Sequence, residues 1–397
     1  MLTGKTVVVG VTGSIAAYKI ANLVRMLTKL HCDVHVLMTQ NATQFINPIT
    51  FETLTNHKCL VDTFDRNFNY NIEHVALAKK ADLCIVAPAS ANVIGKIANG
   101  LADDMLTTTV LACRCKKIVA PAMNTNMYNN PIVQDNLAKL RKYGIEVVEP
   151  AVGALANLDV GVGKLPPEET LLNAILKEIR FPKKDMSGKK VLVTSGATQE
   201  ALDPVRFVTN HSTGKMGKAL AEIAMQRGAE VTYVAAKTEV SAPYAVHVVS
   251  VHSAEEMFEA VRNRADEQDI IIMAAAVSDY TPVFFNDNKI KKYDGTLTVT
   301  FKRTTDILKY LGEHKKAGQF LCGFSMETEN LLENSRKKLQ SKNADMIVAN
   351  NLKVEGAGFG TDTNVVTLIT KDNSVELPCM PKDEVAVAVF DKILQNM

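Results

Sequence analysis

One sequence pattern occurs twice in this chain and limits the folds that it can adopt. Residues 4–14 (GKTVVVGVTGS) and 188–198 (GKKVLVTSGAT) each contain a run rich in β-branched residues that ends in a glycine-containing loop. A helical pattern and a second apolar strand follow in both places, at residues 33–38 and 230–234. Short continuous apolar runs are typical of buried parallel strands, which β-loop-α-β units join into layered sheets. The repeat therefore predicts an α/β chain with two Rossmann-like, doubly wound domains.

The length of the chain also favours two domains. At 397 residues it exceeds the usual size of a single hydrophobic core, so two domains of about 150–200 residues are expected. Residues 181–187 (FPKKDMS) introduce charge and proline directly after an amphipathic helical pattern at residues 168–179. We therefore predict one domain over residues 1–186 and a second over residues 187–397.

The composition is that of an ordinary globular protein, with 47% hydrophobic and 22% charged residues. A formal net charge of +2 gives no strong field that would attract nucleic acid or a membrane surface, so chemistry on small molecules is favoured. No apolar run reaches the ~20 residues that span a bilayer, and the first residues lack the apolar core of a signal peptide. We expect a cytoplasmic protein that binds neither nucleic acid nor membrane.

The seven cysteines show no disulfide framework. Cys113 and Cys115 form a C-x-C pair, but no second Cys or His pair follows at the spacing of a zinc finger. A metal site at this pair is the weaker alternative, and we predict reduced, packed thiols instead.

The first glycine-containing loop predicts a nucleotide phosphate site. Gly10 and Gly13 do not complete the G-x-G-x-x-G dinucleotide pattern, but such a turn offers backbone N–H groups and a helix N-terminus to a phosphate. No acidic residue that could bind a ribose follows the second strand, where Thr39 supplies a hydroxyl instead. A mononucleotide such as FMN therefore fits better than NAD.

Polar groups follow two further predicted strands of the first half. Residues 87–92 (APASAN) come after the apolar run 83–86, and residues 121–128 (PAMNTNMY) come after the run 117–120. Ligands of open α/β sheets bind at the carboxyl ends of the strands. His74, at the start of a short predicted helix, is a further candidate. Taken singly, a histidine of this kind is more often structural and an asparagine of this kind more often a turn residue.

Together these segments resemble the homo-oligomeric flavin-containing cysteine decarboxylases along nearly the whole first half. The resemblance is carried by residues 13–19 (GSIAAYK), His74, 88–92 (PASAN), 102–104 (ADD) and 121–127 (PAMNTNM). It implies that a flavin oxidises the cysteinyl thiol of phosphopantothenoylcysteine to a thioaldehyde, from which CO₂ is lost easily. It also implies that His74 is the base and that Asn124 holds the substrate carboxylate beside Met123 and Met127. The implied FMN contacts are Gly13, Ser14, Ile15, Thr39, Ser90, Ala91 and Asn92.

One position departs from this family. Members of the coenzyme A branch carry a cysteine on a substrate-recognition loop, where the thiol donates a proton in the last reduction step. The corresponding segment here, residues 155–164 (LANLDVGVGK), has Asn157 at that place. A side-chain amide is not a proton donor near neutral pH. The hypothesis is that this half decarboxylates but is impaired in the final reduction, with substitution by a nearby thiol or water as the alternative.

The second half contains a long polar segment, residues 195–217 (SGATQEALDPVRFVTNHSTGKMG), of a kind that is usually functional within an α/β domain. Its Gly214-Lys215 pair does not form a P-loop, because the spacing fails and Met216 occupies the hydroxyl position, so a Walker-type kinase is excluded. Asp279 lies just after the strand pattern at residues 269–273, where it could reach Mg²⁺ on a triphosphate. Residues 289–292 (KIKK) are either a solvated charge run or a mobile loop that closes over phosphates.

These segments, with residues 305–308 (TDIL), 323–328 (GFSMET) and 342–350 (KNADMIVAN), resemble phosphopantothenate–cysteine ligase from about residue 188 to the end. The resemblance implies that the phosphopantothenate carboxylate attacks CTP to give an acyl-cytidylate and pyrophosphate, after which the cysteine amine displaces CMP. It further implies that Asn210 binds the acyl intermediate and that Lys289 stabilises the activation step. The implied nucleotide contacts are Ala274, Ala275, Asp306, Ile307, Leu308, Phe324, Lys338 and Lys342, with Mg²⁺ at Asp279.

Two other interpretations stay open at the level of sequence. The first half could be a non-catalytic flavoprotein regulator or scaffold beside an active ligase, and a nicotinamide oxidoreductase could also be built from two Rossmann units. The resemblance implies a homo-oligomer in which trimers of the first domain and dimers of the second together form a dodecamer.

Overall fold

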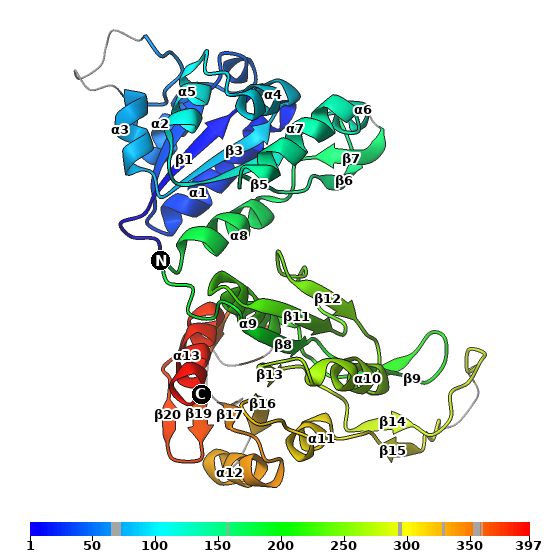
Figure 1. Ribbon diagram of the computed structural model, residues 1–397. Helices are drawn as coiled ribbons and strands as arrows, with labels where there is room; N and C mark the ends of the chain where they lie inside the picture. Colours follow the sequence, from blue (N-terminus) through cyan, green and yellow to red (C-terminus); the bar gives the residue numbers. More distant parts are fainter. Residues whose placement is uncertain (65–72, 157–158, 293–295, 328–329, 352–357, 359) are drawn as a thin grey trace. The chain divides into compact units, whose positions relative to one another are not determined.

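The computed structural model of the chain describes residues 1–64, 73–156, 159–292, 296–327, 330–351, 358 and 360–397. The chain divides into two compact units, Met1–Pro182 and Lys183–Met397. Each unit is an α/β layer structure around a mostly parallel sheet, so the predicted fold class is confirmed (Figure 1). Among the described residues, no helix combines the length and the apolarity needed to cross a bilayer.

The first unit contains a five-stranded parallel sheet with the strand order β2-β1-β3-β4-β5. The strands are β1 (Thr6–Val11), β2 (Asp33–Met38), β3 (Leu83–Ala89), β4 (Lys116–Pro121) and β5 (Glu146–Val147). Every residue of β1 and β3 is buried, because helices cover both faces of the sheet. The order reverses direction between β1 and β3, which is the switch point where doubly wound sheets open a ligand crevice.

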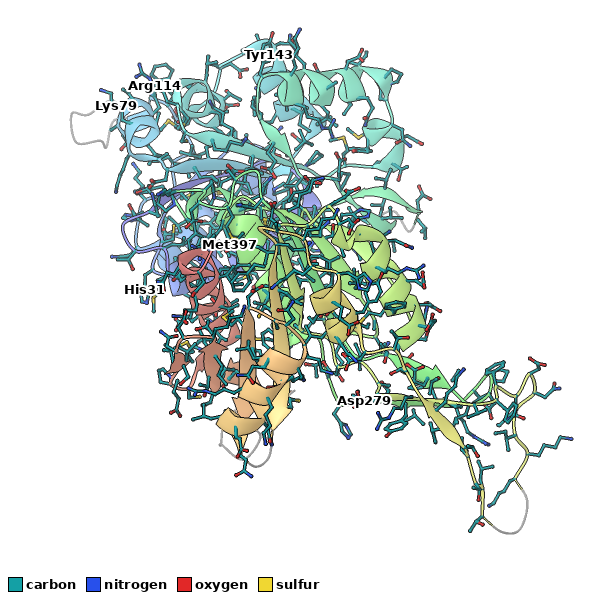
Figure 2. The ribbon with its side chains drawn as sticks, turned by 60° about the horizontal axis from the view of Figure 1, so that its bottom comes forward. His31, Lys79, Arg114, Tyr143, Asp279 and Met397 are labelled. Carbon is teal, nitrogen blue, oxygen red and sulfur yellow. The ribbon has the colours of Figure 1, made fainter. Side chains whose placement is uncertain are left out.

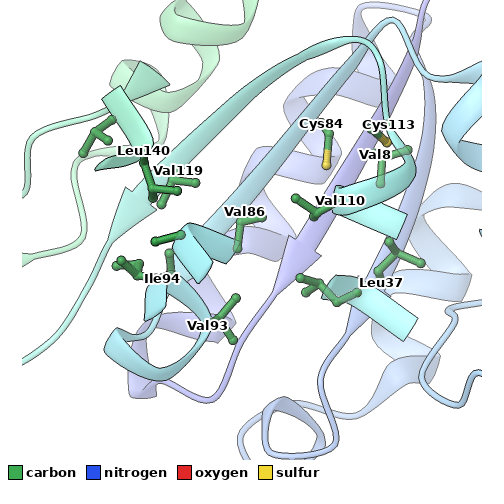
Figure 3. Packing of buried hydrophobic residues seen from close by; sticks show 14 of the residues in the cluster. Val8, Leu37, Cys84, Val86, Val93, Ile94, Val110, Cys113, Val119 and Leu140 are labelled. Carbon is green, nitrogen blue, oxygen red and sulfur yellow. The ribbon is translucent and has the colours of Figure 1, made fainter. Parts of the chain in front are cut away.

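The helices of the first unit are η1 (Ile15–Lys19), α1 (Ile20–Lys29), η2 (Ala42–Gln44), α2 (Pro48–Thr55), α3 (Glu73–Lys80), α4 (Ala91–Asn99), α5 (Met105–Ala112), α6 (Thr125–Tyr128), α7 (Pro131–Lys142) and α8 (Glu168–Ile179). Figure 3 shows how sheet residues such as Val86 and Val119 pack against Ile94 of α4 and Leu140 of α7. Cys84 and Cys113 lie in the same cluster, and all seven cysteines are free. The prediction that the chain has no disulfide framework is therefore confirmed.

The second unit is built on an eight-stranded sheet with the order β12-β11-β8-β13-β16-β17-β19-β20. Its strands are β8 (Lys190–Ser195), β11 (Glu230–Ala235), β12 (His247–Ser250), β13 (Ile270–Met273), β16 (Phe320–Glu327), β17 (Met346–Asn351), β19 (Val366–Thr370) and β20 (Ser374–Glu376). The strands from β12 to β17 run parallel, whereas β19 and β20 are antiparallel additions at one edge. The helices are α9 (Lys215–Gln226), α10 (Ala254–Ala265), α11 (Ile307–Glu313), α12 (Leu331–Ser341) and α13 (Lys382–Gln395).

Three small antiparallel pairs complete the second unit. They are β9 (Gln199–Ala201) with β10 (Phe207–Thr209), β14 (Tyr280–Pro282) with β15 (Phe301–Arg303), and β18 (Thr363–Asn364) with β21 (Met380–Pro381). The loop between β14 and β15 projects beyond Asp279 as an extended arm (Figure 2). The segment between β9 and β10 packs along the base of this arm, because Asn286 N–H donates to the Leu202 carbonyl at 3.1 Å.

Arg227 joins three parts of the second unit at the end of α9. Its guanidinium donates to both oxygens of Asp185, at 2.9 and 2.6 Å, and to Asp391 of α13 at 2.6 Å. The arginine side chain is only 6% exposed, whereas the two carboxylates remain partly exposed. Hydrogen bonding from Arg227 holds the pKa of Asp185 below its usual range even though partial burial opposes this shift. A planar five-donor guanidinium suits this bridging position better than a lysine ammonium.

We predict that Arg227→Met lowers the free energy of unfolding of the second unit by about 2 kcal/mol, because it removes three charge-assisted hydrogen bonds but leaves the carboxylates in contact with water. Urea unfolding of the full chain measures this loss. Arg262→Met is the matched control, because the Arg262–Glu259 pair is an exposed pair within one helix turn and should cost less than about 0.5 kcal/mol. Equal losses in the two variants would contradict the prediction.

Candidate active sites

The loops after β1 and β3 are tied together at the switch point of the first sheet. The Thr12 hydroxyl donates to the Pro88 carbonyl at 2.6 Å and accepts a hydrogen bond from the Ser90 N–H at 2.9 Å. Thr12 is completely buried, so both of these bonds are shielded from water. This side chain therefore fixes the distance between the two loops that the sequence predicted to bind FMN.

The predicted FMN residues lie along this edge of the sheet. Ser14 caps η1 and Ser90 caps α4 through side-chain acceptors to the Ala16 and Val93 N–H groups, at 3.3 and 3.4 Å. Gly13, Ile15, Ala91 and Asn92 flank these caps, with Ile15 and Asn92 exposed. Thr39, at the end of β2, is paired with the Val11 carbonyl through its N–H at 3.0 Å. Hydroxyls, an amide and helix N-termini thus meet at one edge, and this set of donors fits a phosphate-bearing mononucleotide.

The end of β4 places Asn124 beside this crevice. The Ala122 N–H donates to the Ala89 carbonyl at 3.1 Å, which continues the β3–β4 pairing into the loop. Asn124 is half-buried and caps α6, because its Oδ1 accepts from the Asn126 N–H at 2.8 Å. Since Oδ1 is used in this way, the amide Nδ2 is the group that remains to donate to a ligand. Met123 is half-buried and Met127 is exposed on the same segment.

A β-hairpin supports the Asn124 loop from behind. It consists of β6 (Ala151–Ala154) and β7 (Val160–Lys164), and it was not predicted as paired strands. The Met123 N–H donates to the Gly163 carbonyl at 3.0 Å, and the Thr125 hydroxyl donates to the Val162 carbonyl at 2.8 Å. Asn157, the position that departs from the family, lies outside the described residues.

His74, another candidate residue of the first unit, lies on a helix rather than on one of these loops. It is half-buried at the start of α3, which packs against α5. Within the described part of the chain, its ring forms no hydrogen bond with the loops after β1, β3 or β4. The structure thus groups Ser14, Thr39, Ser90 and Asn124 at one edge and leaves His74 on a separate helix.

In the second unit, a cleft of about 820 Å³ opens at the carboxyl ends of β13 and β16. It is lined by most of the residues that were predicted to surround the nucleotide, namely Ala275, Asp279, Asp306, Ile307, Leu308, Phe324, Lys338 and Lys342. Ala274 is the half-buried neighbour of Ala275 and is not itself a lining residue. The sequence prediction missed Arg303 and Thr304, which also line the cleft. Thr304 joins β15 to the strand end, because its hydroxyl donates to the Ser278 carbonyl at 2.7 Å.

The charged residues that line the cleft are mostly cationic, namely Arg303, Lys309, Lys337, Lys338 and Lys342 against Asp279 and Asp306. Asp306 caps α11 by accepting from the Lys309 N–H at 2.9 Å, and it forms an ion pair with Lys342. Burial by itself would raise the pKa of Asp306, but the hydrogen bonds from Lys342 and from the Lys309 N–H, together with the charges of Lys342 and Lys338, outweigh burial and lower the pKa. Lys338 donates to the Phe324 carbonyl at 3.3 Å. The cleft therefore offers several cationic side chains to an anionic ligand.

A glycine in α11 allows Lys342 to reach this place. A Cβ atom on Gly312 would lie only 1.8 Å from the Lys342 carbonyl oxygen, so a larger residue would push the two backbones apart. This contact sets the position of Lys342 at the end of α12 relative to the cap at Asp306.

Three further predicted residues of the second unit lie at different places relative to the cleft, namely Asp279, Asn210 and Lys289. Asp279 is exposed at the mouth, and its backbone carbonyl accepts from the Thr304 N–H at 3.0 Å. Asn210 donates from Nδ2 to the Ala276 carbonyl at 3.2 Å, which places it one residue from the cleft lining. Lys289 is exposed on the projecting arm and is not a lining residue.

Asp203 anchors the arm that carries Lys289, and the sequence prediction missed it. Its side chain is fully buried and accepts from the N–H groups of Val205, Arg206 and Ile290 at 2.8, 2.8 and 3.1 Å. Burial would raise the pKa of this carboxyl, but the three backbone donors lower it. The Asp-Pro sequence at residues 203–204 is a turn signal that could have pointed to it.

Comparisons with known proteins assign each half of the chain to a known family. Residues 1–180 match the family described as Flavoprotein, and residues 186–397 match the DNA/pantothenate metabolism flavoprotein C-terminal domain. The coenzyme A biosynthesis bifunctional protein CoaBC of Bacillus subtilis (strain 168) is 46% identical over 398 residues, which cover 99% of this chain and 97% of that protein. The CoaBC protein of Vibrio vulnificus (strain YJ016) is 39% identical over 394 residues, covering 99% and 98%. This chain belongs to the CoaBC family.

Membership in the CoaBC family makes the chain a bifunctional enzyme of coenzyme A biosynthesis, with a flavoprotein decarboxylase half and a ligase half. A further relative is named cysteine/cysteine sulfinic acid decarboxylase, from an unknown prokaryotic organism. It is 41% identical over 354 residues, which cover 88% of this chain and 99% of that protein. The family resemblance stated from the sequence is therefore confirmed.

The hairpin behind Asn124 gives a first test of how this CoaBC member holds its site. We predict that Gly163→Ala destabilises the first unit by about 1–3 kcal/mol, because Gly163 has a φ of 132° and an added Cβ would lie 2.2 Å from the Met123 carbonyl oxygen. Thermal unfolding and limited proteolysis measure the change. Gly153→Ala on the paired strand is the control, because its Cβ would meet only the flexible Lys164 side chain, at 3.6 Å. Indistinguishable behaviour of the two variants would count against this account.

The Asp306–Lys342 pair predicts a specific pH dependence. Because folding lowers the pKa of Asp306, its charge stabilises the folded state above the ordinary carboxyl pKa of about 4, and this stability is lost as the pH falls through the folded pKa. Asp306→Asn retains a capping acceptor, so it should cost only about 0.5–1 kcal/mol at pH 7, given the exposure of the pair. The difference from wild type should shrink toward zero in urea unfolding at acidic pH. Asp372→Asn serves as the control because Asp372 is exposed, and its free energy of unfolding should equal that of wild type at either pH.

Proposed function

We propose that the second unit joins cysteine to 4′-phosphopantothenate at the expense of CTP, and that the first unit decarboxylates the product with FMN to give 4′-phosphopantetheine. The boundaries proposed for the two activities are residues 1–186 and 187–397. The observation that carries the proposal is that each sheet gathers most of the predicted site residues, though not His74 or Lys289, at one carboxyl edge. Membership in the CoaBC family supports the pairing of the two reactions.

In the first unit, we assign ligand binding to the switch point between β1 and β3. Ser14, Thr39 and Ser90, together with the N–H groups near them, would hold the FMN phosphate, and this strand order is one in which FMN binds at that point. When bound, FMN supplies the two-electron oxidation that makes the substrate carboxylate labile. Asn124 would donate from Nδ2 to that carboxylate. The amide holds it without a counter-charge that would stabilise the ground state.

His74 is proposed as the base that takes the thiol proton of the substrate. Among the described residues no hydrogen bond joins His74 to the strand-end loops, and this fits the expectation that a neighbouring subunit completes each flavin site. Lys289 poses the same problem in the second unit, because it lies on the projecting arm rather than in the cleft lining. Both observations support the proposed assembly into trimers of the first unit and dimers of the second, which together form a dodecamer.

In the second unit, we assign the triphosphate to Lys338 and Lys342. A phosphate that binds Lys342 would replace the Asp306 carboxylate as its partner. Asp279 would hold Mg²⁺ through one carboxylate, with the phosphates as further ligands, which is how Mg²⁺ commonly binds in nucleotide sites. Asn210, fixed on the Ala276 carbonyl, would position the activated carboxyl group. Lys289 would neutralise charge that develops during activation.

Asn157 affects the last step of the proposed decarboxylase reaction, the reduction of the unsaturated thiol. An amide does not supply a proton near neutral pH, so we propose that the last reduction is slow and that an unsaturated thiol is released alongside phosphopantetheine. Each such release would leave FMN reduced, so without oxygen as an oxidant it is limited to one unsaturated thiol per flavin. Asn157→Cys should then raise the fraction of phosphopantetheine. This proposal fails if the wild-type chain, incubated without oxygen, gives only phosphopantetheine at the rate of that variant.

The full chain with phosphopantothenate, cysteine, CTP and Mg²⁺ tests the proposed function. We expect CMP, pyrophosphate and CO₂ together, and much less nucleotide turnover when ATP replaces CTP. His74→Asn should lower CO₂ release by about 10²–10⁴-fold and leave CMP formation unchanged, because it removes only a base. Lys289→Gln should lower CMP formation by about 10²–10³-fold and leave decarboxylation of supplied phosphopantothenoylcysteine unchanged.

Lys302→Gln on β15 of the same arm is the matched control for Lys289 and should behave as wild type. Release of AMP from ATP without use of CTP would refute the nucleotide assignment. CO₂ from free cysteine, but none from phosphopantothenoylcysteine, would instead assign the first unit to the activity named for the cysteine decarboxylase relative.

A further inference from the structure

Three potential metal ligands gather at the opposite end of β2 from the flavin edge. Asp33 is the first residue of β2 and His35 lies two residues further on. His57 comes from the segment after α2, which runs beside β2 because the Leu60 N–H donates to the Val36 carbonyl at 3.0 Å and the Met38 N–H to the Leu60 carbonyl at 2.9 Å. Among the described residues, this is the only group of three or more His, Cys, Asp or Glu side chains whose ligand atoms converge.

The geometry of the group is close to that of a metal centre. The Asp33 carboxylate contacts the Nε2 atoms of both rings, with Oδ1 at 2.7 Å from His57 Nε2 and Oδ2 at 3.2 Å from His35 Nε2. The rings are stacked, with centroids 4.2 Å apart, and all three ligand atoms lie within 4.8 Å of one another. Two atoms bonded to one tetrahedral ion at 2.0–2.1 Å would be about 3.3 Å apart. Small side-chain rotations would therefore suffice for all three groups to bind one ion.

We propose that Asp33, His35 and His57 form a binding site for a divalent transition-metal ion, with Zn²⁺ as the preferred ion. Two imidazoles and one carboxylate are a borderline set of ligands that suits Zn²⁺ and Co²⁺ better than Mg²⁺ or Ca²⁺. His35 and His57 border a cavity of about 440 Å³, from which water could reach a fourth coordination position. The Thr6 hydroxyl orients the carboxylate by donating to Asp33 Oδ2 at 3.3 Å.

Lys80 occupies the place of the cation in the structure without metal. Its Nζ lies 2.6 Å from Asp33 Oδ2 and 3.4 Å from His35 Nε2. The Lys80 side chain is 53% exposed, so it can turn into solvent when an ion arrives. The ammonium therefore competes with the metal for Asp33, and removal of this positive charge should strengthen metal binding. A purely structural ion pair predicts no such gain.

The proposed site is separate from the flavin-edge residues. Asp33 lies at the amino end of β2, whereas Thr39 and the other flavin-edge residues follow the carboxyl ends of their strands. A bound ion would link the segment after α2 to β2, so it should raise the thermal stability of the first unit.

A Co²⁺ titration of the full chain, after removal of metal with a chelator, tests the proposal because tetrahedral Co²⁺ gives an intense visible absorption. We expect one Co²⁺ per chain and displacement of it by Zn²⁺. His57→Asn should weaken binding by at least about tenfold, and Lys80→Gln should tighten it roughly tenfold. His31→Asn is the matched control, because His31 is an exposed histidine with a φ of 60°, which asparagine tolerates.

Thermal unfolding with and without Co²⁺ gives a second measurement. The ion should raise the melting temperature of wild type and of Lys80→Gln but not that of His57→Asn. Equal Co²⁺ affinity in His57→Asn and His31→Asn would overturn the proposal, and so would the absence of binding in both wild type and Lys80→Gln. If His57→Asn does not fold, the comparison of wild type with Lys80→Gln still decides, because only a site centred on Asp33 predicts tighter binding.

Discussion

Both units depend on the shared direction of their central strands. In a parallel sheet every carboxyl end lies at the same edge, and each helix that follows a strand begins there with unpaired N–H groups. Polar loops at these ends can therefore meet even when they are far apart in sequence. Thr12 is an example, because its buried hydroxyl bridges the loops after β1 and β3. Its partner Ser90 is 78 residues away in the sequence.

Close backbone approaches then fix the loops with respect to one another. Gly163 brings the β6–β7 hairpin against Met123, and Gly312 brings α11 against Lys342. Neither glycine is itself a proposed ligand-binding residue. Each determines instead how near a site residue lies to its neighbours, so the geometry at these edges rests partly on residues outside the chemistry.

The sequence was sufficient to predict the central strands and the edge of each sheet that carries the site. The strands at residues 6–11 and 190–195 are buried apolar runs whose pattern has few alternatives. The short pairs β6–β7, β9–β10 and β14–β15 were not predicted, because most of their residues are exposed or half-buried and their pairing depends on contacts with distant loops. Asp203 was missed for a similar reason, since its partner Ile290 is 87 residues away.

The Asp33–His35–His57 cluster shows a further limit of sequence reasoning. Its residues have no motif spacing, and only the pairing of residue 60 with β2 brings His57 to Asp33. Lysines near aspartates are common in any chain, so neither the Asp33–Lys80 pair nor the Asp306–Lys342 pair could be recognised from residue order. Such pairs require coordinates.

These two ion pairs suggest a common physical principle for sites that must exist without their ligands. A partly buried carboxylate or ammonium without a counter-charge would lose hydration with no compensation. In the cleft of the second unit, Asp306 partners Lys342 until an anion can take its place. At the start of β2 the roles are reversed, and Lys80 partners Asp33 until a cation can replace it. Exchange of one partner for another costs less than creation of a new buried charge, so each site can be both folded and receptive before its ligand binds.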